Sequence, residues 1–296
     1  MNEPSSHTPA PPRKIAVIGG DLRQLEAAKS FAQRGYDCQV FGLDVIGDSR
    51  FTETVPVRAA DSLADALRGA DLVLLPLPYS HDGVTVHAPL STQKITVSSL
   101  FTLLSEKQKI AAGLLGQSLP KPFQCFDYAA SEVFAIRNAR ATVEGALAIA
   151  IRETPMTLCG ATVSVVGYGR IGKMLASALA ALGAKVSVFA RSPDQRAWAQ
   201  AEGLTAYALD SLGAQAHSWD VLFNTVPSRV ITEEILAAMK KDAVIIELAS
   251  LPGGVDLHGA AKQGIHMITA SGLPGKYSPQ SAGRIIADTV ADRFGL

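Results

Sequence analysis

The sequence predicts an α/β protein with two Rossmann-like domains, each a doubly wound parallel sheet, separated by a cleft. Two observations support this fold class. Apolar runs alternate with amphipathic stretches along the chain, which is the rhythm of strand–helix–strand units. A segment near the N-terminus also matches a second segment in the middle of the chain. A length of 296 residues suits two domains of ordinary size.

The matching segments are residues 15–44 and 163–192, which align without a gap. Each contains an apolar run, a glycine turn, an amphipathic stretch and a second apolar run. Gly19 aligns with Gly167 and Gly35 with Gly183. We interpret the two segments as the openings of two related units.

Only the second segment is expected to bind a dinucleotide. There Gly167 allows a tight turn, Gly169 lets the backbone approach the pyrophosphate, and Gly172 lets the helix pack close to the strand. In the first segment, Asp21 replaces the second glycine and Gln24 the third. A carboxylate at that place would repel phosphates.

The remaining elements follow in order. In the first half, strands are expected at 14–19, 37–42 and 70–78, helices at 21–35 and 61–70, and one or two further helices within 95–116. In the second half, strands are expected at 161–167, 185–191, 219–227, 243–250 and 265–271, with helices between them.

These elements suggest domain limits. Residues 1–13 are expected to form a disordered tail, 14–137 a Rossmann- or flavodoxin-like substrate domain, and 138–277 an NADP-binding domain. A helix over 136–155 would bridge the domains. The C-terminal amphipathic helix, residues 278–296, is expected to pack on the first domain.

The composition argues against several classes of binding partner. The formal net charge is zero, which argues against binding to nucleic acid or to an anionic membrane surface. No apolar run reaches the roughly 20 residues that span a bilayer. The three cysteines are far apart without a CxxC motif, which argues against disulfides and for a reducing cytoplasm. No metal site is predicted.

The predicted cofactor is NADP(H), which is favoured over NAD(H). An NAD site usually has an acidic residue at the end of the second strand, but here that strand ends in Arg191 and Ser192, which suit a 2′-phosphate. The expected cofactor contacts also include Gly167, Tyr168, Gly169, Arg170, Ile171, Gly172, Asn224, Thr225, Val226 and Pro227.

Three loops at the ends of predicted strands carry polar residues. Residues 247–256 end in Asp256, residues 271–279 present Lys276 and Ser278, and residues 75–87 carry His81. Ligands of open α/β sheets bind at the carboxyl ends of strands. The two glycine-proline loops are therefore expected to contribute to a site, whereas His81 is an acid or base candidate or a solvated loop residue.

Several motifs together resemble one family. The stretches "VIGGDLRQLEAAKSFAQRGYDCQVFG", "RNARATVEGALAIAIRETP", "VVGYGRIG", "ELASLPGGVD" and "GLPGKYSPQSAG" occur in this order. They are similar to the family of the dipicolinate synthase A subunit over nearly the whole chain after the tail. The resemblance implies formation of dipicolinate from a dihydro- or hydroxytetrahydro-dipicolinate of the lysine pathway. It also implies a partner, the flavoprotein-like B subunit, in the mother cell of a sporulating bacterium. A homodimer is left open.

Oxidation of such a dicarboxylate needs a hydride acceptor, a base and cations for two carboxylates. The catalytic candidates are Glu144, Asp256, His81 and Lys276, of which the first three are candidate bases and Lys276 a cation. The candidates for substrate binding are Asp21, Arg23, Arg137, Asn138, Thr142 and Ser278.

Two alternatives stay open at this point. A D-2-hydroxyacid dehydrogenase shares the predicted architecture, although the late loop "ASGLPGKYS" has no histidine. The second alternative is a non-catalytic NADP-binding protein that senses redox state or only supports a partner. Turnover by the isolated chain would separate this last possibility from an enzyme.

Overall fold

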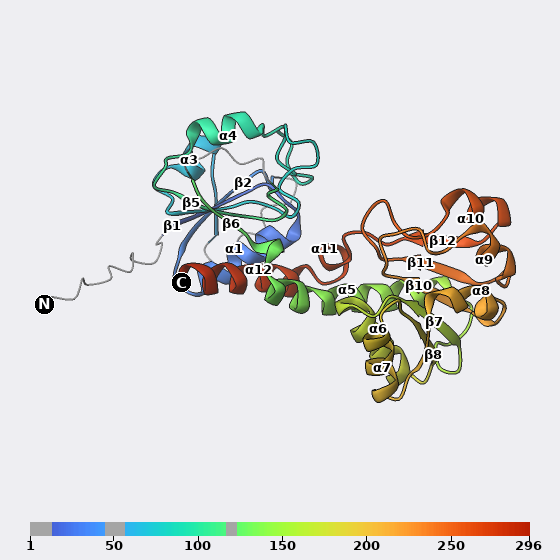
Figure 1. The fold of residues 1–296 in the computed structure, drawn as a ribbon. Helices are drawn as coiled ribbons and strands as arrows, with labels where there is room; N and C mark the ends of the chain where they lie inside the picture. The colour runs from blue at the N-terminus through green and yellow to red at the C-terminus, as the bar shows by residue number, and fades with distance from the viewer. Residues whose placement is uncertain (1–13, 45–56, 117–122) are drawn as a thin grey trace, which may run out of the picture. The chain divides into compact units, whose positions relative to one another are not determined.

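The computed structural model describes residues 14–44, 57–116 and 123–296, which form two compact units (Figure 1). The first unit contains the described residues up to Arg137 together with Ser278–Leu296. The second contains Asn138–Tyr277. The predicted tail, residues 1–13, lies outside the described residues.

The first unit is a six-stranded parallel sheet in the order β3-β2-β1-β4-β5-β6. Its strands are β1 (Lys14–Ile18), β2 (Asp37–Phe41), β3 (Val57–Ala59), β4 (Leu72–Leu74), β5 (Lys109–Ala112) and β6 (Gln124–Asp127). Its helices are α1 (Leu22–Gln33), α3 (Leu63–Leu67), α4 (Val97–Leu103), the short 3₁₀ helix η1 (Tyr128–Ala130) and α12 (Pro279–Phe294).

Helices cover both faces of this sheet (Figure 1). On one face, Ile15 and Val17 of β1 pack with α1 and with Ile286 of α12. On the other, Ala16 and Ile18 pack with α3 and α4. The C-terminal helix therefore completes the core of the first unit although 140 residues of the second unit, Asn138–Tyr277, precede it in the chain.

The second unit repeats this topology, in the order β12-β11-β10-β7-β8-β9, also with parallel pairs. Its strands are β7 (Thr162–Val166), β8 (Lys185–Phe189), β9 (Thr205–Tyr207), β10 (Val221–Asn224), β11 (Val244–Glu247) and β12 (His266–Thr269). Its helices are α6 (Arg170–Ala181), α7 (Pro193–Ala201), η2 (Leu209–Ser211), α8 (Leu212–Gln215), η3 (Ala216–Ser218), α9 (Glu233–Ala238), α10 (Leu257–Gln263) and α11 (Leu273–Tyr277). Helix α5 (Glu132–Glu153) begins in the first unit and continues in the second.

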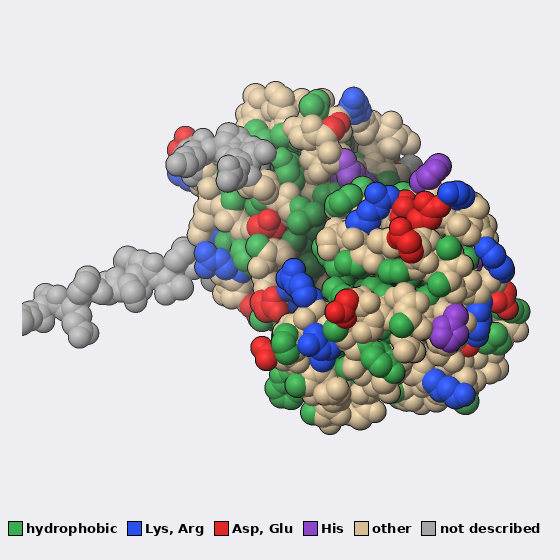
Figure 2. All heavy atoms as spheres, turned by 45° about the vertical axis from the view of Figure 1, so that its right-hand side comes forward, with side chains coloured by type: hydrophobic (Ala, Val, Ile, Leu, Met, Phe, Trp, Pro, Cys, Tyr) green, Lys and Arg blue, Asp and Glu red, His purple; other side chains and the backbone are tan. Residues whose placement is uncertain are grey.

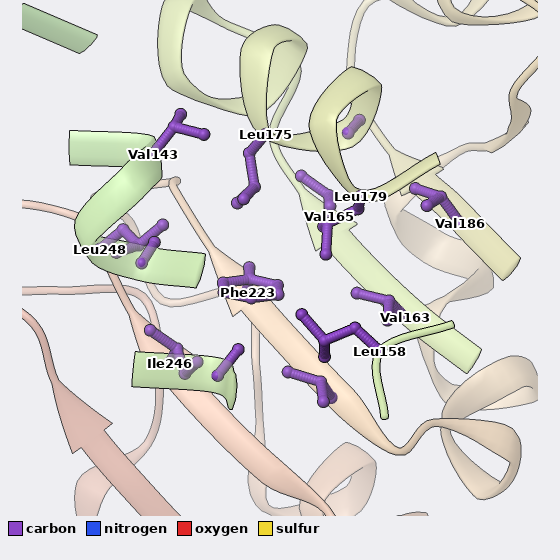
Figure 3. Close-up of a cluster of buried hydrophobic side chains, with 14 of the residues drawn as sticks. Val143, Leu158, Val163, Val165, Leu175, Leu179, Val186, Phe223, Ile246 and Leu248 are labelled. Atoms are coloured by element: carbon purple, nitrogen blue, oxygen red, sulfur yellow. The ribbon is translucent and has the colours of Figure 1, made fainter. Parts of the chain in front are cut away.

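The core of the second unit also has two faces. Figure 3 shows one of them, where Val163, Phe223 and Ile246 of three neighbouring strands meet Leu175 of α6 and Val143 of α5. Trp219, Phe189 and Leu236 belong to the cluster on the other face. Both sheets have the 3-2-1-4-5-6 strand order of a Rossmann domain, so the predicted fold class is confirmed, and the first unit is not flavodoxin-like.

Some expected elements differ. One of the one or two helices expected within 95–116 forms, namely α4, whereas Lys109–Ala112 is the strand β5 beside β4, which was not expected. A short apolar run fits a buried strand or a helix equally well by its periodicity. Residues 271–279 were expected to be a turn and instead contain α11, and β3, β6 and β9 were not expected. These three strands are short and lie at sheet edges.

The surface agrees with the zero net charge. On the face shown in Figure 2, Lys and Arg side chains are interspersed with Asp and Glu. Within the described ranges, no helix combines the length and the apolar character that crossing a bilayer requires.

Candidate functional site

A cavity of about 570 Å³ opens at the carboxyl ends of β7, β8 and β10 in the second unit. Three segments line it: the glycine turn after β7, the end of β8, and the loop after β10. The lining residues are Gly167, Tyr168, Gly169, Arg170, Ile171, Phe189, Ala190, Arg191, Gln195, Leu209, Thr225, Val226, Pro227, Ser228 and Val230. This edge is where Rossmann sheets bind their ligands.

The three glycines of the turn have different structural reasons. Gly167 has φ +96°, and a Cβ there would lie 2.2 Å from Thr225 Oγ1. A Cβ at Gly172 would lie 2.1 Å from the carbonyl oxygen of Gly167. A Cβ at Gly169 would meet no atom within 4 Å. Packing of the protein therefore demands the first and third glycines, whereas the second leaves open space.

Helix α6 starts directly after this turn. Gly169 is its N-cap residue and supplies no side-chain cap, so no side chain at that position accepts from the first N–H groups of the helix. Such a helix end favours an anion. With the open space at Gly169, the turn fits the pyrophosphate of a dinucleotide.

Tyr168 follows Gly167 in the turn and lines the cavity. Its side chain is buried, and its hydroxyl donates a hydrogen bond to Glu202 Oε2 at 2.8 Å. The aromatic ring thus joins the turn to the end of α7.

The end of β8 presents Arg191. This side chain is exposed and borders the cavity, while Arg196 Nη1 donates to the carbonyl oxygens of Ala190 and Arg191 at 2.9 and 2.8 Å. Ser192 is the N-cap residue of α7 and does not line the cavity. The loop therefore has a fixed backbone and carries a guanidinium at the place where NAD sites carry an acid.

At the end of β10, Thr225 is tied to β7. Its backbone N–H and its Oγ1 both donate to the carbonyl oxygen of Val166, at 2.8 and 2.9 Å. Thr225, Val226 and Pro227 line the cavity, as cofactor contacts would. Asn224 does not: it is fully buried, and its Nδ2 lies 2.8 and 3.0 Å from the carboxylate oxygens of Glu247.

Glu247, the last residue of β11, was not among the predicted site residues. Its buried carboxylate accepts hydrogen bonds from Asn224 and from the backbone N–H groups of Ala249, Gly254 and Val255 at 2.9 to 3.1 Å. A Cβ at Gly254 would lie 2.4 Å from Asn224 Nδ2. Glu247 thus binds the loop after β10 to the loop after β11. The only sequence signal was an acid ending an otherwise apolar strand.

The candidates near α10 and α11 have separate surroundings. Asp256 forms an ion pair with Arg229 at the start of α10, and the Gly259 N–H and Arg229 hold the pKa of Asp256 below its usual value. Lys276 is exposed in the last turn of α11. Ser278 is the N-cap residue of α12 and belongs to the first unit.

Four candidates lie on α5, and the unit boundary falls between Arg137 and Asn138. Arg137 is exposed, with Nη1 3.9 Å from Asp292 Oδ2. Thr142 Oγ1 donates to the carbonyl oxygen of Asn138 at 3.3 Å. Glu144 is exposed.

In the first unit, Asp21 and Arg23 form a closed pair at the start of α1. Asp21 caps the helix, and Arg23 Nε and Nη2 lie 2.9 to 3.1 Å from its carboxylate. Arg23 Nη2 also donates to the carbonyl oxygen of Leu77 at 2.8 Å, and the residue is 7% exposed. The guanidinium is therefore already neutralised within the protein.

The glycine turn of the first unit is covered by its own chain. The Gly20 N–H donates to the carbonyl oxygen of His87 at 2.8 Å. Atoms of Val86 and Ala88 would lie 3.1 Å from a Cβ at Gly19. His81, in the same loop, is exposed, and its ring centroid is 4.6 Å from that of His87.

Among the described residues, no group of three or more His, Cys, Asp or Glu side chains is placed to hold a metal ion.

Two known protein families match consecutive parts of the chain. Residues 14–133 match the N-terminal domain of the dipicolinate synthase A subunit. Residues 136–250 match the NAD-binding domain of D-isomer specific 2-hydroxyacid dehydrogenases. The A subunit of dipicolinate synthase from Bacillus subtilis (strain 168) is 33% identical over 291 residues, which cover 94% of each chain. The chain belongs to the family of the dipicolinate synthase A subunit.

Two solved structures show the same fold. The dipicolinate synthase A subunit from Bacillus halodurans has a TM-score of 0.85 at 29% identity and covers 96% of this chain and 98% of its own. The protein of the same name from Bacillus subtilis has a TM-score of 0.82 at 31% identity, with 95% of each chain covered. The resemblance predicted from the motifs is confirmed, and the protein is an NAD(P)-dependent oxidoreductase. The likeness to 2-hydroxyacid dehydrogenases is found in the cofactor domain.

Proposed function

We propose that this protein, as the A subunit of a dipicolinate synthase, oxidises a dihydro- or hydroxytetrahydro-dipicolinate toward dipicolinate with NADP⁺. The observation that supports this proposal most directly is the open glycine turn of the second unit, with a cavity whose rim carries Arg191. Membership of the family supplies the class of product.

The cofactor site would be built from three parts. The turn at Gly169 and the start of α6 would hold the pyrophosphate, and Thr225 and Val226 would border the ribose on the nicotinamide side. Arg191 would bind the 2′-phosphate through charge-assisted hydrogen bonds. NADP⁺, when bound, accepts the hydride. Asn224 would act indirectly, because its amide is committed to Glu247.

The charged candidates for substrate binding differ in how closely another side chain of the protein compensates their charge. Arg137, whose Nη1 lies 3.9 Å from Asp292 Oδ2, and Lys276 are exposed cations, and each is proposed to bind a carboxylate of the substrate. Arg23 is compensated by Asp21, so we propose that this pair shapes the edge of the first sheet rather than clamping the substrate. Glu144 and His81 are preferred as bases over Asp256, because the ion pair with Arg229 stabilises the charged carboxylate of Asp256.

The family name implies a second type of chain in the synthase, and we propose that the partner is a flavoprotein-like B subunit, in the cytoplasm of the mother cell. Each dipicolinate formed by oxidation of a dihydro precursor must release one hydride to NADP⁺ and one proton.

The test uses the purified chain, with and without a B-type partner, supplied with freshly prepared precursor and either NADP⁺ or NAD⁺. NADPH is followed by its near-ultraviolet absorbance and dipicolinate by mass spectrometry. Equal amounts of dipicolinate and NADPH from the chain alone would support the proposal. Dipicolinate formed without NADPH, or only when the partner is added, would assign the oxidation elsewhere.

A further inference from the structure

Two imidazoles meet at the carboxyl edge of the first sheet, in the loop that follows β4. His81 is exposed and His87 is half-buried. Their ring centroids are 4.6 Å apart, and the ring planes are at 88° to each other. Of the two, only His81 was among the predicted site residues.

The backbone around these rings is held in place. The His87 N–H donates to the carbonyl oxygen of Tyr79, and the His87 carbonyl oxygen accepts from Gly20, both at 2.8 Å. Between the two histidines, the carboxylate of Asp82 accepts hydrogen bonds from the N–H groups of Val84 and Thr85 at 2.9 and 2.8 Å. These hydrogen bonds therefore fix the backbone of the loop that carries the two histidines.

The charged groups that act on His87 are His81 in its own loop and the pair Asp21 and Arg23 at the start of α1. Asp21 and Arg23 compensate each other through their forked contact. Burial, together with His81 and Arg23, lowers the pKa of His87 from 6.5, and Asp21 opposes this shift. At neutral pH, His87 is therefore uncharged in the free protein.

We propose that His81 and His87 form a proton-linked binding site for a carboxylate of the ligand, and that the pair takes up one proton from solvent as the carboxylate binds. The ligand class, a dicarboxylate, rests on the proposed function. An imidazolium N–H would donate a charge-assisted hydrogen bond to the carboxylate, and the pair of Asp21 and Arg23 would stay closed.

The physical reason is that carboxylate binding and protonation of the imidazoles are thermodynamically linked. An opposite charge within about 4–6 Å raises the pKa of an imidazole by roughly 1–3 units. Binding then draws a proton wherever the pH lies between the pKa of the free site and that of the bound site. The pKa of free His87 is lowered from 6.5, so the lower end of this window lies below pH 6.5, and its upper end is the pKa of the bound site. Within it, the affinity should fall about tenfold for each unit of rising pH.

The experiment is isothermal titration calorimetry of the full chain with dipicolinate as the probe. Titrations at neutral pH in Tris and in HEPES, which differ in ionisation enthalpy, give the number of protons exchanged on binding. We expect the wild-type protein to take up protons on binding, up to about one for each dicarboxylate bound. His87→Gln and His81→Gln should each weaken binding about tenfold and remove most of the uptake.

His217→Gln is the matched control, because His217 is an exposed histidine in the short helix η3 of the second unit. It should leave affinity and proton uptake unchanged. The wild-type titration needs no variant, so a misfolded variant does not decide the result. Binding without proton uptake, uptake that persists in both loop variants, or no binding at millimolar dipicolinate would overturn the proposal.

Failure of this site and failure of the proposed function give different results. If the chain turns over but binds dipicolinate without taking up a proton, the imidazole site is wrong and the oxidation stands. If proton-linked binding is present but NADPH is not formed, the site stands and the oxidation belongs elsewhere.

Discussion

The two units share a strand order but use their glycine turns differently. In the second unit, the turn opens onto a cavity, and Gly169 faces empty space. In the first, the turn is covered by the loop after β4, and the Gly20 N–H is already bonded to His87. One fold has therefore been adapted twice: open backbone for a phosphate, and a closed turn that carries polar side chains instead.

The largest expected effect comes from Gly172→Ala. The new Cβ would lie 2.1 Å from the Gly167 carbonyl oxygen, so the turn must move, and we expect destabilisation by about 1–3 kcal/mol and loss of measurable NADPH binding. Gly169→Ala is the matched variant, since its Cβ meets nothing within 4 Å. It should weaken NADPH binding with a smaller loss of stability in urea unfolding, since the only cost expected is that alanine is a poorer N-cap residue than glycine. Equal stability losses in the two variants would contradict this distinction.

Glu247→Gln tests what supports the cavity. The substitution places an NH₂ group against backbone N–H donors in a buried site, and an unsatisfied buried group costs about 1–3 kcal/mol. Chemical denaturation should show this loss for Glu247→Gln and not for the exposed control Glu106→Gln. A stability equal to that of the wild type would mean that the carboxylate does not organise the two loops.

Arg191→Ala tests whether the guanidinium at the end of β8 contacts the 2′-phosphate of the cofactor. Removing the guanidinium should weaken NADPH binding about tenfold, which corresponds to about 1.4 kcal/mol, and should leave NADH binding nearly unchanged. Fluorescence titrations with both nucleotides measure the ratio. Parallel losses for NADPH and NADH would show that Arg191 does not contact the 2′-phosphate.

The smallest effect on nucleotide binding is expected from Asp21→Gly, which moves the first turn toward the glycine pattern of the second. Loss of the helix cap should cost little, but loss of the partner of Arg23, which is 7% exposed, should lower the stability by about 3 kcal/mol. No second nucleotide site should form, because the Gly20 N–H is bonded to His87 and the loop still covers the turn. Calorimetry with NADPH should give one site per chain. A stoichiometry of two would break the comparison.

Periodicity and local glycine chemistry could be seen in the sequence. The duplication, the dinucleotide turn at Gly167, Gly169 and Gly172, and most central strands were predicted, because each depends on residues close together in the chain. The strand β5 was missed because its four residues, Lys109–Ala112, are too few to show a distinctive period. Asn224 was expected to contact the cofactor, yet its partner is Glu247, on the neighbouring strand.

By itself, the sequence determined the doubly wound α/β class, the family and which copy has an open glycine turn. Only the tertiary structure decided that Asp21 neutralises Arg23, that Glu247 joins two loops and that His87 lies beside His81 and over Gly20. The physical reason is that buried polar groups must find partners wherever the packed chain brings them. Those partners are set by strand order and loop path, not by spacing along the sequence.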